Sequence, residues 1–421
     1  MIRKNMIGFG IMFLVLACIL CASVTERGFE VKAAEPTQKV KVEEVKIGFN
    51  WSLTGQMAAL AKESKAAALI AVDDINKAGG IKSLGGAKVK LLIADCQYKP
   101  DIAAAEAERL IGQGACVLIG TGSSGADISM ARVAAKYNIP AVIDIGLSPD
   151  VIRQGLKNLF RICGDGDISA KAHARIMEEL KDRLKPYPKT AVVIGPDSLW
   201  FRTTIEAIKK ELGGKIKILD YISYPIGTSS LSTEVTRIKA LNPDVIMGGQ
   251  FVPDAILLVQ ELRAQNFTPL AYWSTDEPAS TEAFIQAAGK LADYRMNIAG
   301  VEANRKSPLY AKVNPRFRKE VGYDLSYDGT ATYTAMMVIF DALERAGTTD
   351  GAALIEAIRK TNLKEHLFVS GLPVHFDEMG QNMAVECCLT QLKNGRLEVV
   401  YPDKYKISDL VWPMPKWSER K

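Results

Sequence analysis

Short apolar segments alternate with longer segments whose apolar residues recur at helical spacing. Residues 45–49 predict a strand, and residues 58–77 predict a helix that ends at the helix-stopping pair Gly79-Gly80. The alternation predicts further strands at 88–94, 116–119, 141–145, 190–194, 217–221, 244–247 and 270–273, and helices at 100–113, 125–137, 200–212, 231–240 and 253–265. Such alternation indicates an α/β fold with parallel sheets covered by helices on both faces. Because the alternation of predicted strands and helices stops after residue 145 and restarts at residue 190, we expect two similar lobes.

The last hundred residues follow a different pattern. Residues 327–346 and 351–361 predict helices, and residues 374–380 predict a strand and a turn. Residues 384–392 and 397–400 predict a hairpin around Asn394-Gly395. No long Pro-, Ser- or Gly-rich linker separates the two halves, so we expect several short crossings, as in hinged proteins.

The N-terminus has the layout of a secretory signal, which we assign to residues 1–34. Arg3 and Lys4 precede an uncharged, mostly apolar segment at 6–24. Cleavage before Cys18, in the lipobox-like residues 15–18, would leave a lipid-bearing cysteine, whereas cleavage after residues 31–33 would release a soluble protein. A third interpretation is an uncleaved anchor, since about 20 apolar residues can span a bilayer. All three predict an exported protein, periplasmic or at the cell surface, that meets the membrane only through an N-terminal lipid or anchor.

Bulk properties narrow the function further. The roughly 385 residues after the signal suit two domains, and their net charge of +3 is too small to indicate nucleic-acid binding. The five cysteines of this part, an odd number, match no metal motif, and a disulfide is allowed but not required: Cys96, Cys116, Cys163, Cys387 and Cys388. The three histidines are far apart in sequence, and we expect them at surface or core positions.

A glycine-rich segment resembles a cofactor-binding motif. Residues 120–125 read Gly-Thr-Gly-Ser-Ser-Gly between a predicted strand and a predicted helix, and Asp144 follows at the end of the next strand. This is the context of a dinucleotide fingerprint, but it follows the third strand rather than the first, and no hydride-transfer residues accompany it. A broader interpretation is an anion site, because small residues expose N–H groups at a helix N-terminus and Ser123 and Ser124 add hydroxyls. A tight turn without a ligand is the alternative.

Other candidate chemistry points to binding rather than catalysis. The sequence contains no G-x-S-x-G or H-E-x-x-H motif, and it indicates no enzyme, cofactor or metal. Aromatic residues gather at predicted strand ends, where ligands bind in open α/β sheets, although packing within loops is the alternative: Trp51, Trp200, Phe201, Phe251, Tyr272 and Trp273. Asp276 and Glu277 follow and could pair with a ligand ammonium or lie in solvent.

A series of motifs in a fixed order resembles the Leu/Ile/Val-binding family of periplasmic-type binding proteins, which deliver ligands to ABC transporters. The motifs are Ser-Leu-Thr-Gly at 52–55, Asp-Asp-Ile-Asn-Lys-Ala-Gly-Gly-Ile at 73–81, Asp95, Gly-Ser-Ser at 122–124, Ile-Pro at 139–140, Tyr-Pro at 224–225 with Gly-Thr at 227–228, Asn-Pro-Asp-Val at 242–245 and Phe-Asp-Glu-Met-Gly-Gln-Asn at 376–382. No single motif is specific, but the series covers nearly the whole chain after the signal.

The resemblance implies a type I periplasmic binding protein, with two lobes joined by a hinge of three crossings and a ligand in the cleft between them. Lobe 1 would comprise residues 44–164 and 298–383, and lobe 2 residues 165–297 and 384–421. It further implies a monomer that is no enzyme and that works with ABC transporter permease subunits. A sensory protein that feeds a signalling partner is the alternative.

The resemblance also implies roles for single residues. Ser124 would hold a ligand carboxylate, with further contacts from the loop at 145–147. The other lobe would supply Trp200, Gln250 and an acid, Asp276 or Glu277, for an ammonium. The candidate binding residues are Trp51, Ser123, Ser124, Ile145, Gly146, Leu147, Trp200, Gln250, Phe251 and Asp276.

The chain departs from the family pattern in two places. The hydroxyl side chain that the family pattern predicts near Leu147 is absent, and Gln250 lies where an aromatic residue is common. The expected ligand is a branched-chain or related amino acid, and an aromatic or other organic acid is the alternative.

Overall fold

A computed structural model describes residues 42–275 and 281–420, and it contains two sheets. The first sheet has five parallel strands in the order β2-β1-β3-β4-β5. Its strands are β1 (Glu44–Trp51), β2 (Lys88–Asp95), β3 (Ala115–Ile119), β4 (Ala141–Ile143) and β5 (Leu159–Arg161). The central strands β3 and β4 are buried along their whole length, as expected for parallel strands covered on both faces.

The second sheet has seven strands in the order β12-β11-β10-β9-β8-β6-β7. Its strands are β6 (Thr190–Pro196), β7 (Lys217–Tyr224), β8 (Val245–Gly248), β9 (Ala271–Thr275), β10 (Met296–Ala299), β11 (Cys388–Lys393) and β12 (Arg396–Tyr401). Strands β6 to β10 are parallel, whereas β11 runs antiparallel to both β10 and β12. The predicted hairpin and the predicted parallel sheets are thus confirmed, with β11 as the antiparallel strand of the second sheet.

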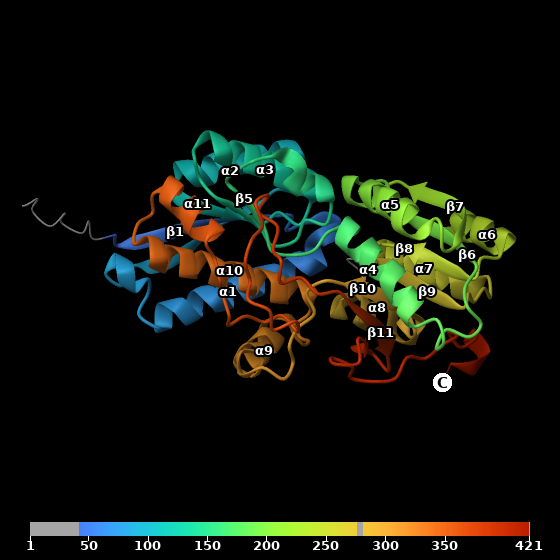
Figure 1. Cartoon of the computed structure of the whole chain (residues 1–421). Coiled ribbons are helices and arrows are strands. Elements are labelled where there is room, and N and C mark those ends of the chain that lie inside the picture. The colour runs from blue at the N-terminus through green and yellow to red at the C-terminus, as the bar shows by residue number, and fades with distance from the viewer. Residues whose placement is uncertain (1–41, 276–280, 421) are drawn as a thin grey trace, which may run out of the picture. The chain divides into compact units, whose positions relative to one another are not determined.

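Helices cover both sheets and join regions that are distant in sequence. The α-helices are α1 (Ala58–Lys77), α2 (Pro100–Gly112), α3 (Ser124–Lys136), α4 (Gly166–Glu179), α5 (Leu199–Leu212), α6 (Ser232–Leu241), α7 (Val252–Ala264), α8 (Glu282–Ala288), α9 (Pro308–Val321), α10 (Tyr327–Ala346) and α11 (Gly351–Arg359). Short 3-10 helices are η1 (Gly55–Met57), η2 (Lys82–Leu84), η3 (Pro149–Gln154), η4 (Gly289–Ala292) and η5 (Trp417–Glu419). Helices α9 and α10, orange in Figure 1, pack on α1, which is blue. None of the described helices is long and apolar enough to cross a membrane.

Three passages of the chain connect the two sheets, as the fold class predicts. The first follows β5, the second follows β10 and the third precedes β11. The three passages pack tightly against one another. A Cβ atom added to Gly300 would lie 2.7 Å from Val385 Cγ1, and one added to Gly164 would lie 3.2 Å from the same atom. The three passages therefore contact each other at residues without room for larger side chains.

Some predicted elements differ from those of the structure. The strand predicted within 374–380 is absent from the described chain, where Val374 and Phe376 form only isolated bridges to Leu363 and Asn382. Five α-helices and β-strands had no prediction: β5, α4, α8, β10 and α9. The five described cysteines are buried and form no disulfide with one another.

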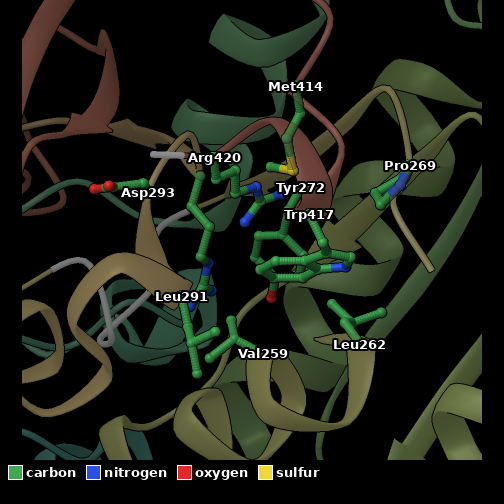
Figure 2. A pocket seen from close by; sticks show the side chains of 10 residues that line it. Val259, Leu262, Pro269, Tyr272, Leu291, Asp293, Met414, Trp417 and Arg420 are labelled. Carbon is green, nitrogen blue, oxygen red and sulfur yellow. The ribbon is translucent and has the colours of Figure 1, made fainter. Parts of the chain in front are cut away.

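The C-terminal segment packs over the end of the second sheet at which the parallel strands begin (Figure 2). Trp417 donates its indole N–H to the Phe267 carbonyl at 2.9 Å, and Arg420 stacks 3.7 Å from the Trp417 ring. A small cavity beneath these residues, beside Tyr272, has room for about one water molecule. The tail thus belongs to the core of the second sheet.

Candidate ligand-binding site

A second cavity lies at the opposite end of the sheets, where the parallel strands end. It is bounded by residues that follow strands of the first sheet and residues that follow strands of the second sheet. Its lining residues are Met57, Tyr98, Gly122, Ser124, Ile145, Gly146, Leu147, Trp200 and Phe251. In open α/β sheets, ligands bind beyond the carboxyl ends of the strands, and these residues occupy that edge. The cavity leaves about 20 Å³ for the centres of water molecules, which is room for one or two waters. We call it the cleft cavity.

Four helices begin at the cleft cavity. Met57 caps α1, Ser124 is the first residue of α3, Trp200 lies in the first turn of α5, and Phe251 caps α7. Each helix N-terminus carries partial positive charge and unsatisfied N–H groups. The described residues that line the cavity include no Lys, Arg, Asp or Glu. The arrangement therefore favours an anion through peptide dipoles rather than through a charged side chain.

Ser124 presents a hydroxyl group on this wall. Its Oγ accepts a hydrogen bond from the Ser148 N–H at 3.1 Å, so the hydroxyl proton can point elsewhere. Ser123, just before it, is buried and caps α3 without a side-chain bond to the helix. The Ser124 hydroxyl and the N-terminus of α3 together supply donors of the kind that a carboxylate needs.

The loop at 145–147 is held from behind by two buried side chains. Asp144 accepts hydrogen bonds from the Trp51 indole N–H at 3.0 Å and from Thr332 Oγ1 at 2.6 Å. Arg161 donates to the carbonyls of Gly146 at 3.0 Å and Ser148 at 2.7 Å. The loop is therefore positioned by groups that do not line the cavity.

Arg161 also joins the ligand loop to the passages between the sheets. Its guanidinium donates to Gln381 Oε1 at 2.7 Å and forms a buried ion pair with Asp165. Asp165 lies in the first passage, and Gln381 precedes the third. Any change in the direction of these passages therefore acts on the same side chain that holds the loop.

Two buried acids lie beneath the cavity wall. Burial raises the pKa of Asp127 well above its ordinary value, although the backbone N–H and hydroxyl of Thr121 donate to it and oppose the shift. Burial raises the pKa of Asp144 to about 6, against hydrogen bonds from Thr332 and Trp51. The raised pKa of Asp127 disfavours its charged form, and this limits the negative charge behind the anion-favouring wall.

Three aromatic side chains form a further part of the cavity wall. The Tyr98 and Phe251 rings meet edge to face with centroids 5.6 Å apart, and Trp200 lies 5.9 Å from Phe251. The Trp200 indole N–H is buried and has no hydrogen-bond partner. We call Tyr98, Trp200 and Phe251 the aromatic triad.

Of the ten candidate residues, six line the cleft cavity: Ser124, Ile145, Gly146, Leu147, Trp200 and Phe251. Trp51 lies behind the wall, with its indole N–H directed to Asp144. Gln250 is buried, where its amide donates to the Ile194 carbonyl at 2.8 Å and accepts from the Tyr272 hydroxyl. Ser123 is buried but does not line the cavity. Asp276, with Glu277, lies outside the described residues.

Three residues that line the cavity were not among the ten candidates: Tyr98, Met57 and Gly122. Tyr98 follows β2 by three residues and has a positive φ of 62°, so no strand or helix pattern marks it. Met57 caps the predicted helix at 58–77 and had no chemical signal. A search at the carboxyl end of the strand predicted at 88–94, which matches β2, would have found Tyr98.

The contacts of the glycine-rich segment at residues 120–125 support a structural role for this segment. A Cβ atom at Gly122, whose φ is +75°, would lie 2.6 Å from the Trp51 ring. Asp144, the acid that a dinucleotide fingerprint would direct to a ribose, is buried against Thr332 and Trp51. Among the described residues, no group of three or more His, Cys, Asp or Glu side chains is placed to hold a metal.

The model of the family described as periplasmic binding protein matches residues 44–396. The chain belongs to the periplasmic binding protein family. Members of this family bind small molecules and are exported, and they are binding proteins rather than enzymes. The resemblance identified in the motif series is thereby confirmed, and this periplasmic binding protein is a solute-binding receptor of the ABC type.

Curated relatives match over most of this periplasmic binding protein. The Leu/Ile/Val-binding protein homolog 7 of Brucella suis biovar 1 is 25% identical over 392 residues, which are 88% of this chain and 94% of the relative. The Leu/Ile/Val-binding protein BraC3 of Rhizobium johnstonii is 31% identical over 222 residues, which are 52% of this chain and 58% of that relative.

Solved structures share the fold. A branched-chain amino acid transporter substrate-binding protein of Streptococcus pneumoniae, in complex with isoleucine, has a TM-score of 0.74 at 21% identity and covers 85% of this chain and 100% of its own. A solute-binding protein of an ABC transporter from R. palustris, in complex with benzoate, has a TM-score of 0.73 at 18% identity and covers 87% and 100%. At these identities the likeness concerns the fold alone.

Proposed function

We propose that this periplasmic binding protein captures a small carboxylate-bearing solute in the cleft cavity and delivers it to the permease subunits of an ABC transporter. The observation that carries the proposal is the convergence of four helix N-termini, with the Ser124 hydroxyl, on a cavity without charged lining among its described residues. This set of donors suits an anion. The apolar and aromatic remainder suits an apolar tail.

The binding residues of the proposal are those at the cavity wall: Met57, Tyr98, Gly122, Ser124, Ile145, Gly146, Leu147, Trp200 and Phe251. We assign residues 44–164 and 298–383 to one lobe and residues 165–297 and 384–421 to the other, with the ligand between them. A cavity with room for one or two waters must widen to admit a larger solute, so the lobes move apart and close again on binding.

A thermal-shift screen over amino acids and aromatic acids tests the proposal. A ligand at 100 times its Kd adds about 2.7 kcal/mol to the free energy of unfolding, which raises Tm measurably. The same screen with the Ser124→Ala variant is the control for binding at the cleft. If no carboxylate raises Tm, and an uncharged solute does, the proposed ligand class is wrong.

Names of relatives and neighbours support both candidate ligand classes. The relatives named Leu/Ile/Val-binding proteins and the neighbour in complex with isoleucine support a branched-chain amino acid as the ligand. The neighbour in complex with benzoate supports an aromatic acid. Delivery to a transporter is tested by uptake of the identified solute in cells that carry or lack this chain. Unchanged uptake would favour a sensory role instead.

A further inference from the structure

One face of helix α5 contacts both the cleft cavity and the residue that precedes η3. Trp200, a member of the aromatic triad, lines the cavity, and Thr203 follows it by three residues on the same side of the helix. Thr203 Oγ1 lies 3.1 Å from Ser148 Oγ, and the two hydroxyls share a hydrogen bond. Because α5 follows a strand of the second sheet and Ser148 follows a strand of the first, this bond joins the two sides of the cleft cavity.

Ser148 connects that bond to the serine that lines the cavity. Its backbone N–H donates to Ser124 Oγ at 3.1 Å, and its carbonyl accepts from the Arg161 guanidinium at 2.7 Å. Its hydroxyl also accepts from the Asp150 N–H at 3.2 Å, and its side chain is buried. Ser148 is therefore fixed by residues on the side of the first sheet, and the Thr203 hydroxyl adds a partner from the side of the second.

An ion pair also joins η3 to the second side, but it contributes less. Arg153 pairs with Asp167 of α4, and their side chains are 53% and 37% exposed, so water and salt screen the attraction. The Thr203–Ser148 bond has a buried partner in Ser148, and a hydrogen bond away from water is stronger. When the two sides separate, both hydroxyls bond to water instead, so this bond belongs to the closed arrangement.

We infer that Thr203 is a positioning residue that couples closure of the cleft to retention of the solute. Its hydroxyl bonds to Ser148 when α5 meets the side of the first sheet, and Ser148 holds Ser124 on the carboxylate. Thr203 is not among the residues that line the cavity, so it acts through Ser148. The inference rests on the proposed function. Because the bond forms after the solute has docked, its loss should speed release and leave capture unchanged.

Binding measurements on variants of Thr203 test the inference. The probes are isoleucine, phenylalanine and benzoate, and the one that binds the wild type most tightly in calorimetry is used throughout. Thr203→Val keeps the shape of the side chain but removes the hydroxyl, and it should weaken affinity about fivefold. Stopped-flow tryptophan fluorescence should show faster dissociation and unchanged association. Thr203→Ser keeps the hydroxyl and should retain wild-type affinity.

Thr204→Val is the matched control, at the next residue of the same helix. The Thr204 hydroxyl donates to the Trp200 carbonyl at 3.0 Å, and the Thr203 hydroxyl lies 2.8 Å from the same carbonyl. Both valine variants lose this bond within the helix, whereas Thr203→Val also loses the bond to Ser148. Thr204→Val should therefore keep wild-type affinity and dissociation rate.

A double-mutant cycle with Ser148→Ala separates positioning from structural support. Once Ser148→Ala has removed the shared bond, adding Thr203→Val should weaken affinity no further. In urea denaturation without a probe, the effects of the two substitutions on the free energy of unfolding should add, because the bond belongs to the closed arrangement. Thermal denaturation of each variant shows whether it is folded, and Thr203→Ser keeps the test usable if Ser148→Ala fails to fold.

Three outcomes would overturn the inference and leave the proposed function standing. They are wild-type affinity in Thr203→Val, additive losses of affinity in the double variant, and coupling of equal size in unfolding without a probe, which would show a permanent bond. If none of the three probes bound the wild type, the carboxylate ligand of the proposed function would fail, and the inference would fail with it.

Discussion

Thr332 Oγ1 donates a hydrogen bond of 2.6 Å to Asp144 Oδ2, across 188 residues of sequence. Thr332 lies in the buried first half of α10, and Asp144 immediately precedes the loop that lines the cleft cavity. The bond therefore fixes a helix of the late chain against the ligand loop of the first sheet. It also lowers the pKa of Asp144, against the raising effect of burial.

Replacing Thr332 by Val should weaken both folding and binding. The substitution keeps the shape but leaves the buried Asp144 carboxyl short of a donor, which costs about 1–3 kcal/mol. Urea denaturation and calorimetry with the identified solute measure the two effects. Thr334→Val is the matched control on the same buried helix, because Thr334 Oγ1 has no hydrogen-bond partner; it should be neutral or stabilising. Equal losses in both variants would contradict the role of Thr332.

Ser124→Ala should lose about 1–3 kcal/mol of binding free energy, because the anion loses a hydroxyl donor in a buried site. The Ser148 N–H also loses its acceptor, so stability should fall slightly. Calorimetry gives the affinity, and thermal denaturation gives the stability. Ser229→Ala, at an exposed position, should leave both unchanged. Wild-type affinity in Ser124→Ala, with folding intact, would exclude this serine from the site.

Arg161→Met should destabilise the fold by about 3–5 kcal/mol, since it leaves the buried Asp165 without its cation and two loop carbonyls without donors. Arg153→Met is the control. Arg153 also pairs with aspartates, Asp150 and Asp167, but its side chain is 53% exposed, and such pairs contribute about 1 kcal/mol or less. Midpoints of urea unfolding compare the two variants, and similar shifts would contradict a structural role for the buried pair.

Glu63 predicts a specific pH dependence of stability. Burial raises its pKa to about 7, although Ser326 and Tyr323 donate to it. Between its ordinary pKa of 4.5 and this value, the folded state retains a proton that the unfolded state has lost, so this contribution to stability falls as pH rises. Glu63→Gln cannot lose that proton, and its stability relative to the wild type should rise from pH 4.5 to pH 7.

Unfolding free energies at several pH values measure that difference. His173, whose pKa burial lowers to about 3, acts in the opposite direction between pH 3 and 6.5, but it is present in both proteins and cancels. Glu108→Gln, at an exposed position, is the control and should show no such trend. A constant difference for Glu63→Gln would mean that Glu63 titrates normally.

Closure of the cleft should reduce the radius of gyration when the solute is added. We expect the hinge at residues 161–165, 296–300 and 382–385, in the three passages that meet at Gly164, Gly300 and Val385. Small-angle scattering with and without saturating solute measures the change. Gly300→Ala, which places a Cβ 2.7 Å from Val385, should reduce the change, whereas Gly214→Ala, with nothing near its added Cβ, should not. Identical radii in the wild type would indicate a rigid pocket.

The sequence predicted most of the α-helices and β-strands. It predicted poorly the elements beside the passages that connect the two sheets. The helix expected at 327–346 matches α10 residue for residue because its apolar spacing is continuous. Strand β5 had no signal, since it is three residues long and ends in the charged Arg161, whose burial depends on Asp165 and Gln381. At the site, six residues followed from strand ends and the family resemblance. Tyr98 did not, because its position depends on a loop with positive φ rather than on a periodic pattern.

Recognition by four helix N-termini has a consequence for a protein that works outside the cytoplasm. Peptide dipoles hold no exchangeable charge, so the attraction that they exert on a carboxylate does not change when the surroundings become acidic or alkaline. A histidine or a lysine in the same place would gain or lose its charge with the medium. The attraction from the dipoles therefore persists over the whole range in which the solute itself stays ionised, and Asp144 behind the wall, whose pKa burial raises to about 6, is a group whose charge changes within that range. The solute's own acidity sets the lower limit.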